Sequence, residues 1–411
     1  MISTVLTAFA LLTAPVFGSP VQMLTVQHFA GEISGRHIVT LKSEVEKSAH
    51  LSWLESARLT SGSAVTVTNA EWDSSVLHGY AGEFSEDALN ALRASPDVES
   101  IEEDGIMHTF ATVTEHVQSA NDVDCLSNAP WGLARLSTNN ALTGSATALT
   151  YSYQYDSSAG AGVDIYVVDT GISTTHSDFG GRARLGAVFG SSQNVDGNGH
   201  GTHVSGTAAG TRWGVAKAAS LIAVKVLNDG GSGTVSDIVS GLNFVATSAR
   251  SSGRPSIATM SLGGSASTAL DSAVSSIFSM MHSVHVTVAA GNSATNAANT
   301  SPARVATANT IGASSITDAI ASFSNFGSVV DLFAPGVSVT SSWIGSSTAT
   351  NTISGTSMAT PHVAGLIAYL IGRNGNSSPA AISTTLKNLA VSGALSGIPS
   401  GTANLLARND I

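Results

Sequence analysis

The feature that most constrains this fold is a series of short apolar segments in the C-terminal two-thirds of the chain. The segments are VDIYVVD (163–169), SLIAVKVL (220–227), IATMSL (257–262), VHVTVAA (284–290) and ANTIGA (308–313). Helical patterns separate several of them, at 235–249 and 267–281. Near-continuous apolar strands that alternate with helices predict an α/β fold, in which helices cover both faces of a parallel sheet. In such a sheet, ligands bind at the carboxyl ends of the strands.

A different kind of unit precedes this region. Within residues 36–104, strand patterns at 37–41, 74–84 and 98–104 are separated by amphipathic helix patterns at 44–59 and 85–94. This order predicts a small α+β unit of ferredoxin-like type. Residues 105–127 lack a clear periodicity and form the expected linker. Residues 128–411 then form the expected α/β domain.

Charge divides the chain at nearly the same place. Residues 1–119 carry 15 acidic and 5 basic side chains, a net charge of −10. Residues 120–411 carry 13 acidic and 12 basic side chains, a net charge of −1. Neither part has the basic surface that nucleic-acid binding requires, so that class of function is excluded. No later stretch is long and apolar enough to predict a membrane span.

The N-terminus has the features of a secretory signal over residues 1–18. An apolar stretch from Val5 to Phe17 is followed by the small residues Gly18 and Ser19, which predicts cleavage near Gly18 and export. A buried N-terminal helix is the alternative, because no Lys or Arg precedes the apolar stretch. Cys125 is the only cysteine, so no intrachain disulfide can form. Its polar, Asp-flanked surroundings favour an incidental thiol over a catalytic one.

Several residues have the types that acyl transfer needs. Asp169 ends the first apolar segment, where an α/β sheet places its site. Ser357 begins a buried helix pattern, so its backbone N–H lies at the positive end of the helix dipole. His200 lies in a glycine-rich segment and is a candidate general base. Asn292 follows a buried strand and offers a side-chain amide to an oxyanion hole.

Three other interpretations of these residues are disfavoured. DTG is also the motif of aspartic proteases, but their chemistry needs a second carboxylate, and the chain has no second DTG or DSG. A zinc site is predicted by H-E-x-x-H, whereas His200 and His203 are three residues apart and no glutamate follows Glu115. A dedicated esterase of the α/β-hydrolase type is disfavoured, because the G-x-S-x-G elbow is absent.

In these motifs and their order, the chain resembles the subtilisin-like serine proteases, and within them the proteinase K group of secreted fungal enzymes. The motifs are VVDTGI, GNGHGTHVSGT, SLGG, AAGN and SGTSMATPHVAGL, and the resemblance covers about residues 128–407. Residues 36–104 resemble an inhibitor I9-type propeptide. The resemblance implies a secreted, monomeric serine endopeptidase that is made as an autoprocessed zymogen. Its expected partners are protein substrates and its own propeptide.

The resemblance also assigns roles to single residues. It implies Ser357 as the nucleophile, His200 as the general base and Asp169 as the carboxylate that orients it. Asn292 and the Ser357 N–H would form the oxyanion hole, and His203 would be a structural neighbour. The implied substrate-binding residues are Gly231, Ser232, Gly233, Ser261, Leu262, Gly263, Ala289, Ala290 and Gly291. The resemblance places two substrate-binding strands at 230–234 and 261–264, and main-chain pairing with them implies broad specificity. Residues 289–292 would help form the primary pocket, and the small residues there imply room for an apolar or aromatic side chain before the scissile bond.

No cofactor is expected for the chemistry, and a structural calcium is the one metal that the resemblance implies. Its ligands would be the carbonyl oxygens of Ala306 and Ala308 and the carboxylate of Asp331. Glycosylation sequons begin at Asn299 and Asn376, and the proline after each sequon lowers the expected occupancy.

The rival from another class is an inactive relative that binds peptides, or that inhibits proteases through residues 36–104. All four catalytic positions carry residue types that can work, which favours an active enzyme.

Overall fold

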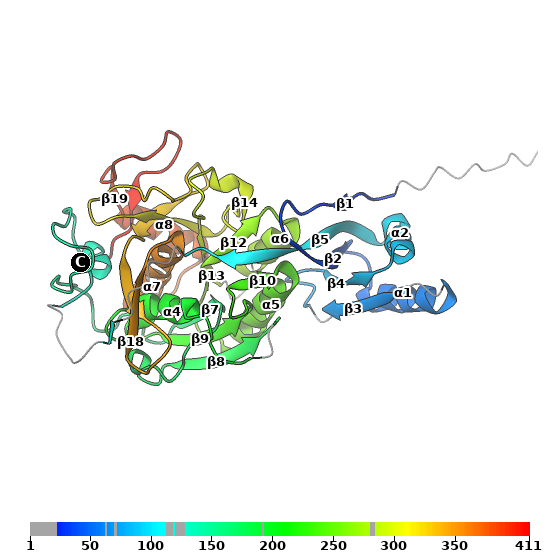
Figure 1. Ribbon diagram of the computed structural model, residues 1–411, viewed down its shortest axis with the longest axis horizontal. Coiled ribbons are helices and arrows are strands. Elements are labelled where there is room, and N and C mark those ends of the chain that lie inside the picture. The colour runs from blue at the N-terminus through cyan, green and yellow to red at the C-terminus, as the bar shows by residue number, and fades with distance from the viewer. Residues whose placement is uncertain are drawn as a thin grey trace, which may run out of the picture.

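The computed structural model of this chain describes residues 23–61, 64–69, 72–111, 118–119, 128–190, 193–279 and 284–411. The expected signal over residues 1–18 and Cys125 lie outside these described residues. A smaller N-terminal unit and a larger unit lie side by side in Figure 1. Among the helices of the described residues, none combines the length and the apolar character that crossing a membrane requires.

The N-terminal unit is an α+β sandwich. Its elements are β1 (Val26–Gln27), β2 (Ile33–Leu41), α1 (Lys47–Ser61), β3 (Val65–Asn69), β4 (Gly79–Phe84), α2 (Glu86–Ala94) and β5 (Val98–Thr109). Its own core contains Val39, Tyr80 and Leu92. Ser85 caps α2, because its side chain accepts a hydrogen bond from the N–H of Ala88 at 3.4 Å.

The larger unit is built on a nine-stranded sheet with the order β19-β20-β16-β15-β13-β11-β7-β9-β8. These strands are β7 (Asp164–Asp169), β8 (Ala183–Val188), β9 (Ser220–Lys225), β11 (Ser256–Met260), β13 (His285–Ala289), β15 (Asn309–Ser314), β16 (Leu332–Pro335), β19 (Val391–Ser392) and β20 (Leu405–Leu406). Every neighbouring pair except β19–β20 is parallel.

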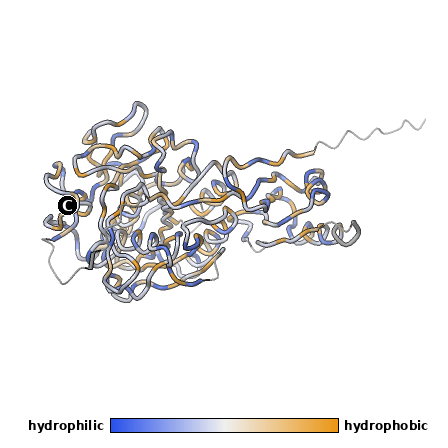
Figure 2. Tube along the Cα trace, viewed as in Figure 1, coloured by the Kyte–Doolittle hydropathy of each residue, from blue (hydrophilic) through white to orange (hydrophobic). Residues whose placement is uncertain are grey.

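Helices cover both faces of this sheet. They are α4 (His200–Ala209), α5 (Val235–Ser252), α6 (Thr268–Ser279), α7 (Thr356–Asn374) and α8 (Pro379–Leu389), and a short α3 (Trp131–Arg135) precedes β7. Along β7, Ile165 and Val167 join the core that contains residues of α4 and α7, whereas Tyr166 and Val168 join the core of α5 and α6. Hydrophobic residues recur through both units (Figure 2). The expected α/β class is confirmed.

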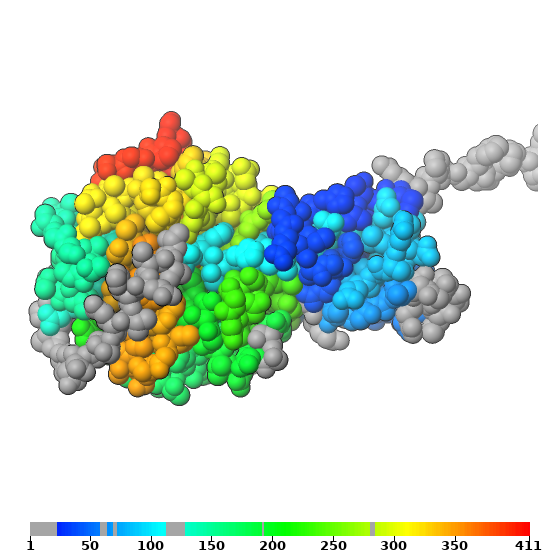
Figure 3. All heavy atoms as spheres, viewed as in Figure 1, coloured from blue at the N-terminus to red at the C-terminus, as the bar shows by residue number. Residues whose placement is uncertain are grey.

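Strand β5 is longer than the strand expected at 98–104. It continues to Thr109, and its end lies between β10 (Ser232–Thr234) and β12 (Leu262–Ser265) of the larger unit, antiparallel to both. One sheet, completed by β14 (Thr300–Ser301), therefore joins the two units. In Figure 3 this cyan segment crosses the body between green and yellow atoms. Residues 105–109 are extended because strands distant in the sequence pair with them. This pairing does not require a strand pattern in residues 105–109 themselves.

Two smaller differences concern local structure. The strand expected at 74–84 is shorter and begins at Gly79, and β3 has no counterpart among the expected strands. A small three-stranded sheet, with the order β17-β18-β6, also lies outside the expected pattern. Its strands are β6 (Gln118–Ser119), β17 (Val339–Ser342) and β18 (Ala349–Ile353).

Candidate active site

Asp169 and His200 come from different elements and meet at the carboxyl edge of the large sheet. Asp169 is the last residue of β7, and His200 is the first residue of α4. The Nδ1 atom of His200 lies 2.7 Å from Oδ1 of Asp169, and both side chains are buried. A carboxylate at this distance keeps a proton on Nδ1, so Nε2 of the neutral imidazole can accept one.

A glycine brings these two elements close together. A Cβ atom at Gly201 would lie 2.1 Å from the carbonyl oxygen of Gly171, far inside van der Waals contact. The first turn of α4 can therefore pack against the chain that follows Asp169 only because position 201 has no side chain.

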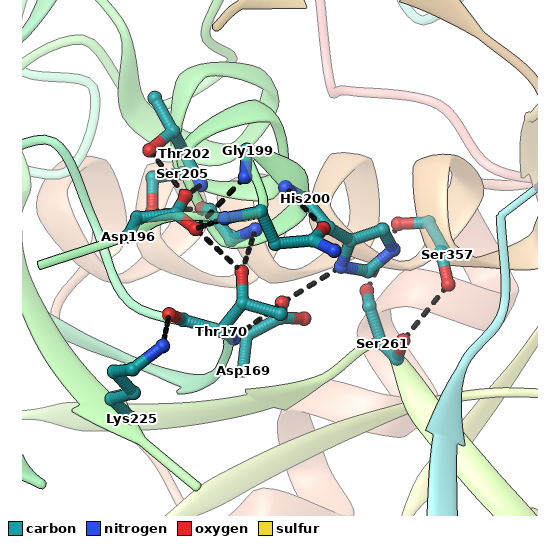
Figure 4. A network of polar contacts seen from close by, with 12 residues as sticks. Asp169, Thr170, Asp196, Gly199, His200, Thr202, Ser205, Lys225, Ser261 and Ser357 are labelled. Atoms are coloured by element: carbon teal, nitrogen blue, oxygen red, sulfur yellow. Dashed lines mark hydrogen bonds and ion pairs between the residues drawn. The ribbon is translucent and has the colours of Figure 1, made fainter. Parts of the chain in front are cut away.

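Asp196 is a positioning residue that the sequence analysis missed. Its carboxylate accepts five hydrogen bonds, from the N–H groups of Asn198, Gly199 and Thr202 and from the hydroxyls of Thr170 and Thr202. These bonds hold the N-terminus of α4 against the strand end that carries Asp169 (Figure 4). An aspartate just before a helix start is the sequence signal that would have found it.

A buried lysine supports the same strand end. Lys225 is the last residue of β9, and its ammonium donates to the carbonyl oxygen of Thr170 at 2.7 Å and to Oδ1 of Asp229 at 2.9 Å. The side chain of Lys225 is fully buried, so these partners compensate its charge.

His203 lies one turn after His200 and has structural contacts. Its Nε2 donates to the carbonyl oxygen of Val339 at 3.0 Å. Burial lowers the pKa of His203 to about 3, so its ring is neutral at neutral pH. Its ring also lies edge-on to Trp343, with 6.1 Å between centroids.

Ser357 lies in the first turn of α7 and beside the imidazole of His200 (Figure 4). Its Oγ donates to the carbonyl oxygen of Ser261 at 2.9 Å, and the Oγ of Ser261 donates back to the carbonyl oxygen of Ser357 at 2.9 Å. The buried Nε2 of His200 has no hydrogen-bond partner among the described residues. A Ser357–His200 hydrogen bond therefore requires Ser357 to turn away from Ser261.

The carbonyl oxygen of Phe110, directly after β5, accepts two hydrogen bonds from this site. Nδ2 of Asn292 donates at 2.7 Å, and the N–H of Ser357 donates at 3.3 Å. The Oδ1 of Asn292 accepts from both the N–H and the hydroxyl of Thr356, each at 2.9 Å, which fixes the amide orientation. This is the donor geometry of an oxyanion hole, with a peptide carbonyl held in it.

A second glycine allows this close approach. A Cβ atom at Gly355 would lie 2.2 Å from the Phe110 oxygen and 3.1 Å from Cα of Ala111. The peptide bond between Phe110 and Ala111 thus lies directly against the start of α7.

The sequence-predicted substrate strands flank the end of β5. Ser232 and Gly233 pair with His108 and Met107, and Leu262 and Gly263 pair with Thr109 and His108. The N–H of Thr109 donates to the Gly231 oxygen at 3.0 Å, and that of Phe110 donates to the Ser261 oxygen at 3.4 Å. All six residues of the two expected strands therefore contact one extended segment, in the manner of β-augmentation.

Two glycines of the expected substrate-binding residues lie beside the half-buried side chain of Phe110. Cβ atoms at Gly263 and Gly291 would lie 2.6 Å and 3.8 Å from its ring. Ala289 and Ala290 are fully buried. Three residues earlier, Met107 is also fully buried, and a Cβ atom at Gly264 would lie 2.7 Å from its sulfur. Two apolar side chains, one of β5 and one just after it, thus pack against adjacent glycines of β12.

The expected calcium ligands do not fit the ion as they stand. One carboxylate oxygen of Asp331 lies 2.7 Å from the ammonium of Lys387, and the other accepts from the N–H of Thr310 at 2.8 Å. A calcium site needs carboxylate oxygens available to the metal, and here a lysine already supplies the positive charge. No group of three or more His, Cys, Asp or Glu with metal-binding geometry occurs in the described part of the chain.

We expect that removal of calcium leaves the stability of the protein unchanged. Excess EDTA should change the midpoint of thermal unfolding by less than about 1 °C, because calcium that is not bound to the folded state does not stabilise it. Differential scanning calorimetry with and without calcium checks this. A calcium-dependent midpoint that Asp331→Asn abolishes would instead assign the ion to Asp331.

The two sequon asparagines, Asn299 and Asn376, are both exposed. Oδ1 of Asn376 lies 2.9 Å from Nε2 of His285. Their glycosylation stays a prediction.

Comparison with protein families assigns both units. Residues 160–405 match the model described as "Subtilase family", and residues 36–110 match the one described as "Peptidase inhibitor I9". The inhibitor match ends at Phe110, one residue after β5.

Relatives of known description cover most of the chain. An alkaline serine protease of Corniculantispora psalliotae is 44% identical over 400 residues, which cover 97% of this chain and 96% of that protein. A cuticle-degrading protease of Metarhizium anisopliae is 42% identical over 382 residues, which cover 92% of this chain and 90% of that protein. The crystal structure of a cold-adapted subtilisin-like serine proteinase matches with a TM-score of 0.63 and 43% identity, and covers 69% of this chain and all of that one.

Proposed function

The chain belongs to the subtilase family and is a subtilisin-like serine endopeptidase with an I9 propeptide, and on this premise we propose that it cleaves its own Phe110–Ala111 bond. The same site then hydrolyses other proteins. The proposal assigns the chemistry to Asp169, His200 and Ser357, with Asn292 as oxyanion donor. The enzyme needs no cofactor for this chemistry.

The observation that carries the proposal is the position of the Phe110 carbonyl. Its oxygen accepts from Nδ2 of Asn292 and from the N–H of Ser357. Donors at that oxygen stabilise the negative charge that develops there when a nucleophile adds to the carbonyl carbon. Both donors therefore act on the carbonyl group of one residue, Phe110, which directly follows β5.

The proposed first half-reaction transfers the propeptide to the enzyme. The Oγ of Ser357 attacks the Phe110 carbonyl carbon while Nε2 of His200 takes the hydroxyl proton. Asp169 stabilises the resulting imidazolium through Nδ1. Collapse of the tetrahedral intermediate breaks the C–N bond, and His200 gives its proton to the departing nitrogen of Ala111.

The second half-reaction releases the propeptide. Water loses a proton to Nε2 of His200 and adds to the acyl carbon, and the bond to Oγ of Ser357 breaks as His200 returns the proton. The products are a propeptide that ends in the Phe110 carboxylate and a mature chain that begins with Ala111. Since β5 keeps its pairing with β10 and β12, the product strand stays in the cleft as an inhibitor.

The same contacts support the proposed substrate preference. Phe110 and Met107 pack against adjacent glycines of β12, whereas the side chain of His108 between them is exposed. Main-chain pairing contributes affinity without sequence selectivity, so broad specificity with an apolar or aromatic residue before the scissile bond follows. We also propose that residues 1–18 direct export of the enzyme, and that the enzyme acts outside the cell as a monomer.

N-terminal sequencing and active-site labelling test this function. We expect the mature protein to begin with Ala111 and to hydrolyse casein and a Met-His-Thr-Phe chromogenic peptide. A serine-directed fluorophosphonate should label Ser357 and abolish both activities. Folded protein that is free of the propeptide, yet neither labelled nor active, would exclude an enzyme and favour a peptide-binding protein.

A substitution at Phe110 tests the processing bond itself. Phe110→Asp should slow self-cleavage at least about 100-fold, because the pocket between Gly263 and Gly291 would have to desolvate a carboxylate. His108→Asp is the matched control, since it places the same charge at an exposed position of the same strand. Mass spectrometry of the precursor over time gives both rates. Equal rates for the two variants would show that another bond is cut.

A further inference from the structure

The propeptide also contacts the larger unit outside the cleft, through the residues just before β4. Trp72 is buried, and its Nε1 donates to Oγ of Ser240 on α5 at 2.8 Å. That hydroxyl donates in turn to the carbonyl oxygen of Ser236 at 2.9 Å, so it is oriented to accept from the indole. The N–H of Asp73 donates to Oδ1 of Asn243 at 2.8 Å. Ser240 and Asn243 are three residues apart and share one face of α5.

The Trp72 ring lies in a hydrophobic cluster that both units share, and not in the propeptide's own core. This cluster contains Ile38 of the propeptide together with Ile238, Val239 and Leu242 of α5. The separate propeptide core, around Tyr80, does not include it. An indole with an apolar body in a pocket and a satisfied N–H is typical of the residues that dominate binding at protein interfaces.

A polar rim surrounds this anchor. Arg250, in the last turn of α5, lies 3.3 Å from a carboxylate oxygen of Asp73. The other oxygen of Asp73 accepts from the N–H of Ser75 at 2.9 Å, which braces the loop. Exposed ion pairs contribute little affinity. The ion pair of Asp73 therefore orients the segment around Trp72, and the indole contributes most of the binding free energy.

This contact is separate from the cleft strand. Ser240 and Asn243 follow the first turn of α5, whereas the cleft is formed by β10 and β12 on either side of β5. The N-terminal turn of α5 is itself occupied by Asp104, whose carboxylate accepts from the N–H of Ser236 at 2.9 Å. Cleavage after Phe110 breaks none of these contacts. In Figure 1 the blue propeptide lies beside the green α5.

We propose that the face of α5 that carries Ser240 and Asn243 is an exosite for the Trp72–Asp73 segment of the propeptide. The proposal rests on the proposed self-cleavage, after which this anchor keeps the severed propeptide bound and sets how long the enzyme stays latent. In the free mature enzyme, the same face would offer a binding site for a tryptophan followed by an acidic residue.

Latency of the full-length, self-cleaved protein tests the exosite. The purified non-covalent complex is diluted into a chromogenic peptide, and the lag before full activity gives the dissociation rate constant of the propeptide. Trp72→Ala should raise this constant at least about 30-fold, as expected for loss of a hot-spot anchor. Trp53→Ala is the matched control, because Trp53 is 40% exposed on α1, and it should stay within about twofold.

A double-mutant cycle isolates the indole–serine contact. Trp72→Phe removes only the indole N–H and part of the ring, and Ser240→Ala removes its acceptor. Each substitution should raise the dissociation rate constant of the propeptide roughly 3- to 10-fold. The rate constant of the double variant should be little higher than that of either single variant, because both substitutions remove the same hydrogen bond. Once fully activated, all variants should share the wild-type kcat/KM.

Each failure has a different signature. Wild-type protein that stays inactive after complete removal of the propeptide contradicts the proposed function. Normal wild-type latency with an unchanged dissociation rate constant for Trp72→Ala contradicts the exosite alone. If Trp72→Ala does not fold, the double-mutant cycle tests the exosite instead. Fully additive effects of Trp72→Phe and Ser240→Ala on the dissociation rate constant would overturn the proposal.

Discussion

Replacing Ser357 by alanine is expected to lower kcat by about 10⁶-fold and to leave the Phe110–Ala111 bond intact in the precursor. The variant has no nucleophile to form the acyl-enzyme, and only the oxyanion donors and binding contacts remain. The magnitude is that found for the corresponding serine of subtilisin, a member of the same family, rather than a quantity obtained from this structure. Peptide hydrolysis and the intact mass of the precursor are the measurements.

A matched serine variant controls for folding. Ser347→Ala removes a hydroxyl from an exposed loop position and should mature and hydrolyse peptide at the wild-type rate. Adding wild-type enzyme to the Ser357→Ala precursor separates self-cleavage from cleavage by another molecule. Normal maturation of Ser357→Ala in the absence of other proteases would refute self-processing.

Replacing Asn292 by alanine should lower kcat by about 10²- to 10³-fold with little change in KM. Its Nδ2 lies 2.7 Å from the oxygen on which negative charge develops, so its hydrogen bond strengthens towards the transition state. This range also comes from the equivalent donor of subtilisin. Full Michaelis–Menten curves on a chromogenic peptide separate the two constants.

An aspartate at the same position distinguishes the donor from the scaffold. Asn292→Asp keeps an oxygen to accept from the N–H and hydroxyl of Thr356 but loses the Nδ2 donor. It should lose at least as much activity as the alanine variant while unfolding at a temperature near that of wild type. A loss below about tenfold, or one confined to KM, would remove Asn292 from the oxyanion hole.

The family, the fold class and the two units were predictable because their signals are local. The apolar segments specify buried parallel strands through their composition alone. Asp169 at the end of one of them, and Ser357 at the start of a buried helix, have positions that element boundaries determine. The roles of these residues stay predictions that the experiments above test.

Contacts between distant segments were not predictable in the same way. Residues 105–109 look like a linker, yet β10 and β12 hold them in a sheet, and those strands lie more than a hundred residues further along the chain. Asp331 looks like a calcium ligand until Lys387 is found beside it. Trp72 has no pattern around it that indicates a partner on α5.

By itself, then, the sequence determined the main parallel strands, several of the helices between them and the residue types at their ends, because periodicity and caps act within a few turns of chain. Only the tertiary structure decided that the Phe110 carbonyl lies between Asn292 and the Ser357 N–H, and that Ser357 donates to Ser261 rather than to His200. These outcomes depend on side-chain and strand pairings over long sequence separations. Such pairings are selected by the packing of the whole molecule rather than by local preference.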